Sequence, residues 1–339
     1  MKALIIFTFF LFTNAFAINE LDYKNNYDTF VRPFLSTMQD GYLQSNGLRL
    51  HYKTALNPEA PYCLVILPGR SEPAEKYAEF IYDLKTSVVG NYLNFFVLDH
   101  RGQGSSDRMD PKTDMGHVDQ FENYVSDVDH FLNQVVSPYK CKKRFLFAHS
   151  MGAGIGLSWV LKNEKYFDGL MISSPMLKIQ TKPYSYAVAK SIVSAMMVIG
   201  KGNEFALGQK PFNANEPFET NKFTTSKVRF KMTMDLFAEY PQTKLGGVSN
   251  RWLYEIMNGT RKVRSSYKKF KLPIHLYRAG TELYSESAEM KKFCDEALQC
   301  QDMLLETSKH EVVNDSDDNR NLVLYDMVMF LDHFKVNDL

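Results

Sequence analysis

Residues 144–154, with the sequence RFLFAHSMGAG, constrain the fold of this chain more than any other stretch. A short apolar run leads to Ser150, which lies between small residues, and a glycine-rich segment suited to a helix follows. A strand, a tight turn and a helix in this order expose a serine hydroxyl at the end of a sheet. The usual pattern is Gly-x-Ser-x-Gly, and here Ala148 replaces the first glycine, a change of one methyl group. We therefore expect a nucleophilic serine at position 150.

Apolar, strand-like runs alternate with helix-like segments along the chain. The runs lie near residues 64, 95, 145, 170 and 274. This alternation predicts an α/β fold in which a mostly parallel central sheet carries helices on both faces. Residues 41–43 and 48–54 flank an Asn-Gly pair, which is typical of a hairpin turn. We expect this hairpin to add an antiparallel edge to the sheet.

About a hundred residues separate the strand near residue 170 from the strand near residue 274, far more than a single crossover helix needs. We therefore expect a helical cap inserted into the core. It contains two apolar segments, at 184–199 and 252–257, which we expect to pack mostly on the body. The predicted organisation is a signal peptide over 1–17, a first core segment over 18–175, the cap over 176–270 and a second core segment over 271–339.

The charge balance bears on the kind of partner that the chain can bind. The chain has 40 Lys and Arg against 39 Asp and Glu, and 45% of its residues are hydrophobic. This composition is that of an ordinary globular protein, and the near-zero net charge gives no electrostatic reason to expect a nucleic-acid partner.

The first seventeen residues have the pattern of a secretory signal peptide. One lysine precedes the apolar run of residues 3–12, and small residues occupy the positions that a signal peptidase requires, Ala15 and Ala17. The run is short for a membrane-spanning helix, which needs about 20 residues. We therefore predict cleavage after Ala17 and export to the periplasm or the exterior. Ile18, and not a cysteine, follows the cut, so no N-terminal lipid anchor is expected.

Four cysteines follow this signal peptide: Cys63, Cys141, Cys294 and Cys300. In an oxidising compartment an even number permits disulfides. Cys294 with Cys300 and Cys63 with Cys141 are candidate pairs, and buried free thiols are the alternative. No CxxC pair occurs, so we expect neither a metal site nor a cofactor.

Acyl transfer by a serine needs a histidine base, an acid that orients the histidine, and donors for the oxyanion. Among eight histidines, His310 lies between a predicted last strand at 303–305 and an amphipathic helix at 319–334. The last loop of such a sheet delivers an imidazole to the serine, which makes His310 the candidate base. His149 adjoins Ser150, but neighbours on a tight turn point apart, so we expect a structural role for it.

The orienting acid should follow a strand upstream of His310. Residues 274–277 form that strand, and Glu282 lies in the loop after it, which makes Glu282 the candidate. Glu286 and Glu289 are close enough to compete. The residues alone leave this choice open.

Two backbone amides should receive the oxyanion, one after the nucleophile and one in the loop after the strand at 63–67. Met151 and Arg70 occupy these positions. The Arg70 guanidinium could also meet a substrate phosphate, with simple exposure to solvent as the alternative.

With these residues in place, the chain resembles the lysophospholipase and monoacylglycerol lipase branch of the α/β-hydrolases, and it is most similar to the bacterial membrane-associated lysophospholipases. The resemblance implies an α/β-hydrolase fold with its nucleophile at Ser150, its base at His310, its acid at Glu282 and its oxyanion loop at 68–70. The cap resembles the family poorly. The stretches that carry the resemblance are LPGRSEPAEKYAEFIYDL (67–84), LDHRGQGSSDR (98–108), FENYVSDV (121–128), FAHSMGAGIGLSWVL (147–161), SSPMLKI (173–179), LYRAGTELYS (276–285) and SKHEVVNDSD (308–317).

The activity that the resemblance implies is hydrolysis of the acyl ester of a lysophospholipid through an acyl-enzyme. Monoacylglycerol lipase or general carboxylesterase activity is the alternative, because these enzymes share the catalytic residues and differ in the headgroup pocket. An inactive hydrolase fold that binds lipid or protein is an alternative of another class, which the retained Ser150, His310 and Gly69 disfavour. The expected partners are a lysophospholipid or monoacylglycerol and, at the periphery, a membrane. Basic residues at 261–271 either favour an anionic surface or form a solvated face.

Overall fold

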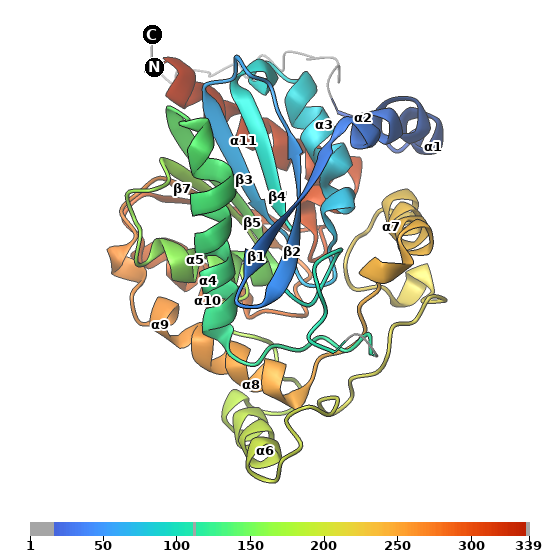
Figure 1. Cartoon of the computed structure of the whole chain (residues 1–339), viewed down its shortest axis with the longest axis vertical. Helices are drawn as coiled ribbons and strands as arrows, with labels where there is room; N and C mark the ends of the chain where they lie inside the picture. The colour runs from blue at the N-terminus through green and yellow to red at the C-terminus, as the bar shows by residue number, and fades with distance from the viewer. Residues whose placement is uncertain (1–16, 111–112, 337–339) are drawn as a thin grey trace, which may run out of the picture.

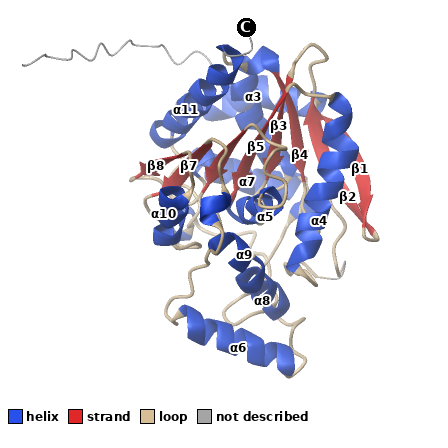
Figure 2. Ribbon diagram, turned by 90° about the vertical axis from the view of Figure 1, so that its left-hand side faces the viewer, coloured by secondary structure: helices blue, strands red, loops and turns tan. Residues whose placement is uncertain are grey.

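The computed structural model describes residues 17–110 and 113–336. The predicted signal peptide therefore lies, except for Ala17, outside the described residues. Eight strands form one sheet in the order β1-β2-β4-β3-β5-β6-β7-β8, and helices cover both of its faces (Figure 1, Figure 2). The strands are β1 Gln39–Ser45, β2 Leu48–Ala55, β3 Tyr62–Leu67, β4 Leu93–Leu98, β5 Lys143–His149, β6 Gly169–Ser173, β7 Ile274–Ala279 and β8 Cys300–Leu305.

The sheet confirms the predicted α/β architecture. Strands β3 to β8 pair in parallel, whereas β1 and β2 form an antiparallel hairpin whose second strand pairs antiparallel with β4. At the hairpin turn Asn46 and Gly47 adopt φ angles of 48° and 81°, the left-handed conformation that an Asn-Gly turn supplies. The hairpin is therefore the antiparallel edge that the sequence predicts.

Alternating side chains of the central strands supply two separate cores. In β3, Leu64 and Ile66 join the core under one layer of helices, while Val65 and Leu67 join the core under the other. All four side chains are fully buried, because a parallel strand covered on both faces has no solvent side. One layer contains α1 Tyr23–Asn26, α2 Arg32–Thr37, α3 Ala78–Thr86 and α11 Asp317–Val336, and the other contains α4 Phe121–Phe131, α5 Ser150–Val160 and α10 Ser287–Glu296.

Four α-helices lie between β6 and β7, within the segment predicted as a cap. They are α6 Tyr186–Val198, α7 Lys227–Glu239, α8 Asn250–Gly259 and α9 Arg261–Arg264. Helix α8 buries Trp252, Ile256 and Met257 in the core shared with α4 and α5. Helix α6 lies beyond α8, far from the sheet (Figure 2).

The expectation that the apolar segment 184–199 packs mostly on the body holds only for one side of it, where Tyr186 and Ala189 pack against the core. Helix α6 contacts α8 along one side, and Val193 is its single buried residue. On the other side of the segment, Val188, Val198 and Ile199 are exposed. No helix in the described part of the chain combines the length and apolar character that crossing a bilayer requires.

Both candidate cysteine pairs are disulfides. Cys63 in β3 bonds to Cys141 just before β5, the adjacent strand, with 5.8 Å between the two Cα atoms. Cys294 in α10 bonds to Cys300 at the start of β8, with 5.1 Å between the Cα atoms. The first bond closes a loop of 78 residues. In the chain-entropy description, such a cross-link contributes on the order of 4 kcal/mol to the free energy of unfolding.

Candidate active site

Ser150 occupies a strained turn between β5 and α5. Its φ angle is 48°, a left-handed conformation that is unusual for a residue other than glycine. A Cβ atom placed on Gly152 would lie 2.2 Å from the carbonyl oxygen of Leu67, so only glycine allows α5 to approach β3 this closely. Ala148 is fully buried in β5, and a Cβ atom placed on Gly156 would meet its methyl group at an ordinary 3.8 Å. The turn therefore accommodates alanine at its first small position.

A continuous hydrogen-bond chain runs from Ser150 through His310 to Glu282. Ser150 Oγ lies 2.8 Å from His310 Nε2, and His310 Nδ1 lies 2.7 Å from Glu282 Oε2. The other oxygen of Glu282 accepts hydrogen bonds from the backbone amides of Tyr284, at 2.8 Å, and Ser285, at 3.0 Å. The structure thus brings together three residues that lie up to 160 positions apart in the sequence.

The charges in this hydrogen-bond chain favour one tautomer of His310. Burial raises the pKa of Glu282, but the charge of His310 and the hydrogen bonds outweigh burial and lower this pKa below its ordinary value. Glu282 is therefore an acceptor, and Nδ1 of His310 carries the proton that it donates. Nε2 then accepts the hydrogen bond of the Ser150 hydroxyl. Burial lowers the pKa of His310, but the carboxylate of Glu282 outweighs burial. The pKa of His310 is therefore raised above its ordinary value.

The two competing acids are bound elsewhere. Glu286 Oε2 lies 2.9 Å from the ammonium of Lys178, and Glu289 Oε1 accepts a 2.8 Å hydrogen bond from the hydroxyl of Tyr267. The glutamate that contacts His310 is therefore Glu282.

The loop after β3 is held against the turn that carries Ser150. The amide of Gly69 donates to Glu72 Oε2 at 2.6 Å, and the Gly69 carbonyl accepts from Gln103 Nε2 at 2.9 Å. A Cβ atom placed on Gly69 would lie 2.7 Å from the ring of His149, which shows how closely the two segments approach. Arg70 follows this glycine, and Met151 belongs to the first turn of α5, where amides have no partner within the helix.

A buried carboxylate that the sequence did not single out, Glu72, holds this loop. Glu72 accepts hydrogen bonds from Tyr77 and, at 2.8 Å, from Lys76, whose ammonium also contacts Glu311 at 2.6 Å. Burial raises the pKa of Glu72, but Lys76 outweighs burial and lowers it to about 2. Glu72 and Lys76 are four residues apart, and this spacing is the sequence pattern that could have predicted their ion pair. Their partner Glu311 directly follows His310, so this network also holds the histidine loop.

Two aromatic side chains frame the histidine. The ring of Tyr284 lies 4.9 Å from that of His310, and the ring of His149 lies 4.8 Å from it. His149 Nδ1 is 3.0 Å from Ser173 Oγ, and burial lowers the pKa of His149 to about 4. His149 is therefore a neutral packing group, and Tyr284 is a neighbour that the sequence did not single out.

Arg70 presents a half-buried cation beside the site. Its guanidinium donates to two neutral oxygens, the carbonyl of Gly246 and the hydroxyl of Ser71, and lies 5.8 Å from the ring of Trp252. Its Nε is buried without a hydrogen-bond partner in the described chain. Burial lowers the pKa of Arg70 to about 10. The guanidinium remains charged at neutral pH and retains donor capacity.

One cluster in the described part of the chain has metal-ligand chemistry, and none of its residues belongs to the hydrogen-bond chain of Ser150, His310 and Glu282. Asp40, His51 and Glu75 bring one ligand atom each within 4.8 Å of one another. The ammonium of Lys53 already contacts Asp40 at 2.6 Å and Glu75 at 3.5 Å. A lysine therefore supplies the positive charge of this cluster.

The sheet, the strand-to-helix serine and the Ser-His-Glu hydrogen-bond chain define an α/β-hydrolase. The sequence matches the Hydrolase_4 family, described as serine aminopeptidase, S33, over residues 58–317. That match covers more than half of the chain, and the protein belongs to this family. Within it, the chain is a carboxylic ester hydrolase of the lysophospholipase and monoglyceride lipase type.

Individual relatives agree with this placement. The chain is 26% identical over 303 residues to "Probable lysophospholipase L2" of Haemophilus influenzae, covering 88% of this chain and 94% of that protein. It is 29% identical over 276 residues to "Lysophospholipase L2" of Escherichia coli, covering 79% of each. A soluble variant of the monoglyceride lipase of Saccharomyces cerevisiae has a similar fold, with a TM-score of 0.68, 16% identity and coverage of 88% and 95% of the two chains.

Proposed function

We propose that this protein is an exported serine hydrolase that cleaves the acyl ester of lysophospholipids through Ser150, His310 and Glu282. The observation that carries the proposal is the unbroken hydrogen-bond chain from the Ser150 hydroxyl to the Glu282 carboxylate. A serine hydroxyl is a weak nucleophile until a base removes its proton, and this hydrogen-bond chain places His310 Nε2 at 2.8 Å from the Ser150 Oγ atom.

The two-step reaction follows from these roles. Ser150 Oγ attacks the ester carbonyl carbon while His310 Nε2 takes its proton, and Glu282 stabilises the imidazolium that forms. The backbone amides of Arg70 and Met151 receive the oxyanion. His310 then gives the proton to the leaving glycerol oxygen. Water, activated by the same histidine, hydrolyses the acyl-enzyme and restores Ser150.

Arg70 favours a phosphate-bearing substrate over a neutral monoacylglycerol. A guanidinium bound to neutral oxygens alone, with Nε unpartnered, can form charge-assisted hydrogen bonds to a phosphate. It follows Gly69, which packs against His149 beside the nucleophile, and its guanidinium lies 5.8 Å from the ring of Trp252. The relatives named lysophospholipase L2 support the same choice. Monoacylglycerol lipase activity is the second candidate, supported by the monoglyceride lipases among the relatives.

Arg70→Met is expected to raise KM for lysophosphatidylcholine and lysophosphatidylethanolamine at least about tenfold, because a charge-assisted hydrogen bond contributes roughly 1.5–3 kcal/mol. KM for monoolein should change less than about threefold, since that headgroup is neutral and the backbone amide is retained. Fatty-acid release from the three lipids measures both values. Arg108→Met is the matched control, because Arg108 is half-buried and donates to carbonyl oxygens of Gly102 and Gln242.

Two results would contradict the lysophospholipid assignment. One is an equal loss of activity toward monoolein and the lysophospholipids in Arg70→Met. The other is a wild-type preference for monoolein over every lysophospholipid, which would favour the monoacylglycerol alternative.

Helix α6 is our proposed site of peripheral membrane contact. Val198 and Ile199 at its carboxyl end are 86% and 62% exposed, and Val188 near its start is also exposed. Apolar side chains on an outward helix gain free energy when they enter the headgroup region of a bilayer. The wild-type protein should therefore co-sediment with vesicles of phosphatidylethanolamine and phosphatidylglycerol.

The double variant Val198→Ser, Ile199→Ser should weaken this vesicle binding by about tenfold or more. The variant loses the free energy that the two apolar side chains gain when they move from water into the bilayer. Activity toward a water-soluble p-nitrophenyl ester should not change. Leu298→Ser removes a similarly exposed leucine from the loop between α10 and β8 and is the control. Equal vesicle binding by the wild type and the double variant would refute contact through α6.

Export is supported by the cysteines as well as by the pattern of residues 1–17. All four cysteines are paired in two disulfides, which form and persist in oxidising compartments. We place the mature protein in the periplasm or outside the cell, and its N-terminus provides a direct test.

A further inference from the structure

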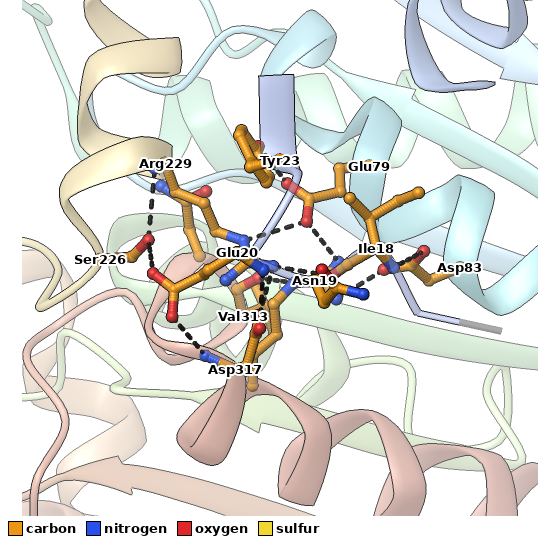
Figure 3. Close-up of polar contacts among 12 residues, drawn as sticks. Ile18, Asn19, Glu20, Tyr23, Glu79, Asp83, Ser226, Arg229, Val313 and Asp317 are labelled. Atoms are coloured by element: carbon orange, nitrogen blue, oxygen red, sulfur yellow. Dashed lines mark hydrogen bonds and ion pairs between the residues drawn. The ribbon is translucent and has the colours of Figure 1, made fainter. Parts of the chain in front are cut away.

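The first residues after the predicted cleavage site enter a buried polar pocket (Figure 3). Ile18 is only 7% exposed, and its backbone N–H donates to Asp83 Oδ1 at 3.0 Å. Its carbonyl oxygen accepts a 2.9 Å hydrogen bond from Arg229 Nη2. Asp83 lies in α3 and Arg229 in α7, and both side chains are fully buried. The segment is therefore held at its first residue by two buried charged groups.

Negative charge exceeds positive charge in this pocket. The guanidinium of Arg229 lies 3.0 Å from Glu79, and that of Arg320 lies 2.5 Å from Asp83. Burial raises the pKa of Asp83 to about 7, so Arg320 offsets the cost of burying this carboxylate only in part. The carboxylates of the pocket are Glu20, Glu79, Asp83 and Asp317, and its guanidiniums are Arg229 and Arg320.

We propose that the chain is cut between Ala17 and Ile18 and that the new α-ammonium group of Ile18 forms a buried ion pair with Asp83. Hydrolysis of this peptide bond adds water, leaves a carboxylate on Ala17 and gives Ile18 an amine that binds a proton at neutral pH. The nitrogen already aims its one amide hydrogen at Asp83 Oδ1. The ammonium keeps that contact, adds two donors and adds a third cation to a pocket in which carboxylates outnumber guanidiniums.

The pocket is connected to the loop that carries His310. Arg229 Nη1 donates to the carbonyl oxygen of Asp315 at 2.8 Å, and Asp315 Oδ2 accepts from the amide of Lys309 at 2.7 Å. The side chain of Glu20 accepts hydrogen bonds from Ser226, before α7, and from the amide of Asp317, at the start of α11. Arg229 therefore links the Ile18 segment and α7 to the loop that carries His310.

The inference rests on the proposed export and not on the esterase activity. Intact-mass measurement on protein made from the full-length gene in a secreting bacterial host should give a mature chain that begins at Ile18. A chain that retains any earlier residue, or that begins later, would overturn the proposal. Fluorophosphonate labelling of the same sample reports the serine hydrolase separately, so failure of one idea is distinguishable from failure of the other.

The ion pair is tested by comparing a chain that begins at Ile18 with a chain extended by the natural residues Phe16 and Ala17. Asp83→Asn should lower Tm in the Ile18 form by roughly 4 °C more than in the extended form, since only the first contains the ammonium. Asp22→Asn, an equal charge change on the exposed side of the same segment, should shift Tm equally in both forms. Equal shifts for Asp83→Asn would refute the ion pair.

A measurement on the unmodified mature protein does not depend on the folding of a variant. The Ile18 amine should react with acetic anhydride at least about tenfold more slowly in the native protein than in urea, because a buried, paired ammonium is protonated and inaccessible. Mass analysis of the N-terminal peptide gives both rates. A native rate equal to the unfolded rate would contradict the proposal even if Asp83→Asn does not fold.

Discussion

Ser150→Ala is expected to reduce ester hydrolysis by at least about 10⁴-fold and to abolish covalent labelling by a fluorophosphonate. In the proposed mechanism the Oγ atom of Ser150 forms the acyl-enzyme, and His310 alone cannot replace it. The fold should be retained, because alanine keeps the Cβ atom and adds no bulk to the turn. Thermal unfolding of the two proteins measures this, and fatty-acid release measures the loss.

Ser158→Ala is the matched control for this variant. Ser158 lies on the same helix, is buried, and donates a 2.7 Å hydrogen bond to the Gly154 carbonyl. Its loss should cost stability of roughly 1 kcal/mol and leave labelling intact. If folded wild-type protein is not labelled, or if Ser150→Ala retains full activity, the serine hydrolase assignment is wrong.

Glu282→Gln should lower kcat by about 10³–10⁴-fold with a small effect on KM. A glutamine amide can donate to His310 Nδ1, and this favours the tautomer in which Nε2 carries the proton and cannot accept from Ser150. The residual activity should also change its pH dependence. The wild-type rate should fall as pH decreases through the raised pKa of His310, and loss of the Glu282 charge should move that midpoint to lower pH.

Glu286→Gln is the control for the choice of acid. Glu286 is partly exposed and pairs with Lys178, so its loss should change activity less than about threefold and stability by at most about 1 kcal/mol. If Glu286→Gln lost more activity than Glu282→Gln, the order of the two roles would be reversed.

Much of the fold could be predicted because its signals are local. Eleven consecutive residues predict the strand, the turn at Ser150 and the glycine-rich helix. Two residues, Asn46 and Gly47, predict the hairpin turn. Fully apolar runs such as β3 predict buried parallel strands without knowledge of their neighbours. These features depend on backbone conformation and on burial of a single segment.

The choice among neighbouring acids needed the tertiary structure. Its place in the loop after the strand made Glu282 the candidate and left Glu286 and Glu289 as competitors. In the structure the amides of Tyr284 and Ser285 hold Glu282, and Glu282 contacts His310. The exposure of α6 could not be predicted from the sequence either. An apolar helix that packs on the body has the same composition as an apolar helix that is exposed.

The sequence by itself therefore determined the α/β class, the serine at the strand-to-helix turn and the histidine in the last loop. Only the tertiary structure decided which glutamate contacts that histidine, how Glu72 and Lys76 meet Glu311, and how Ile18 reaches Asp83 and Arg229. The physical reason is separation along the chain. Ile18 and Arg229 are 211 residues apart, and a buried charge takes its partner from whichever segments the fold brings together.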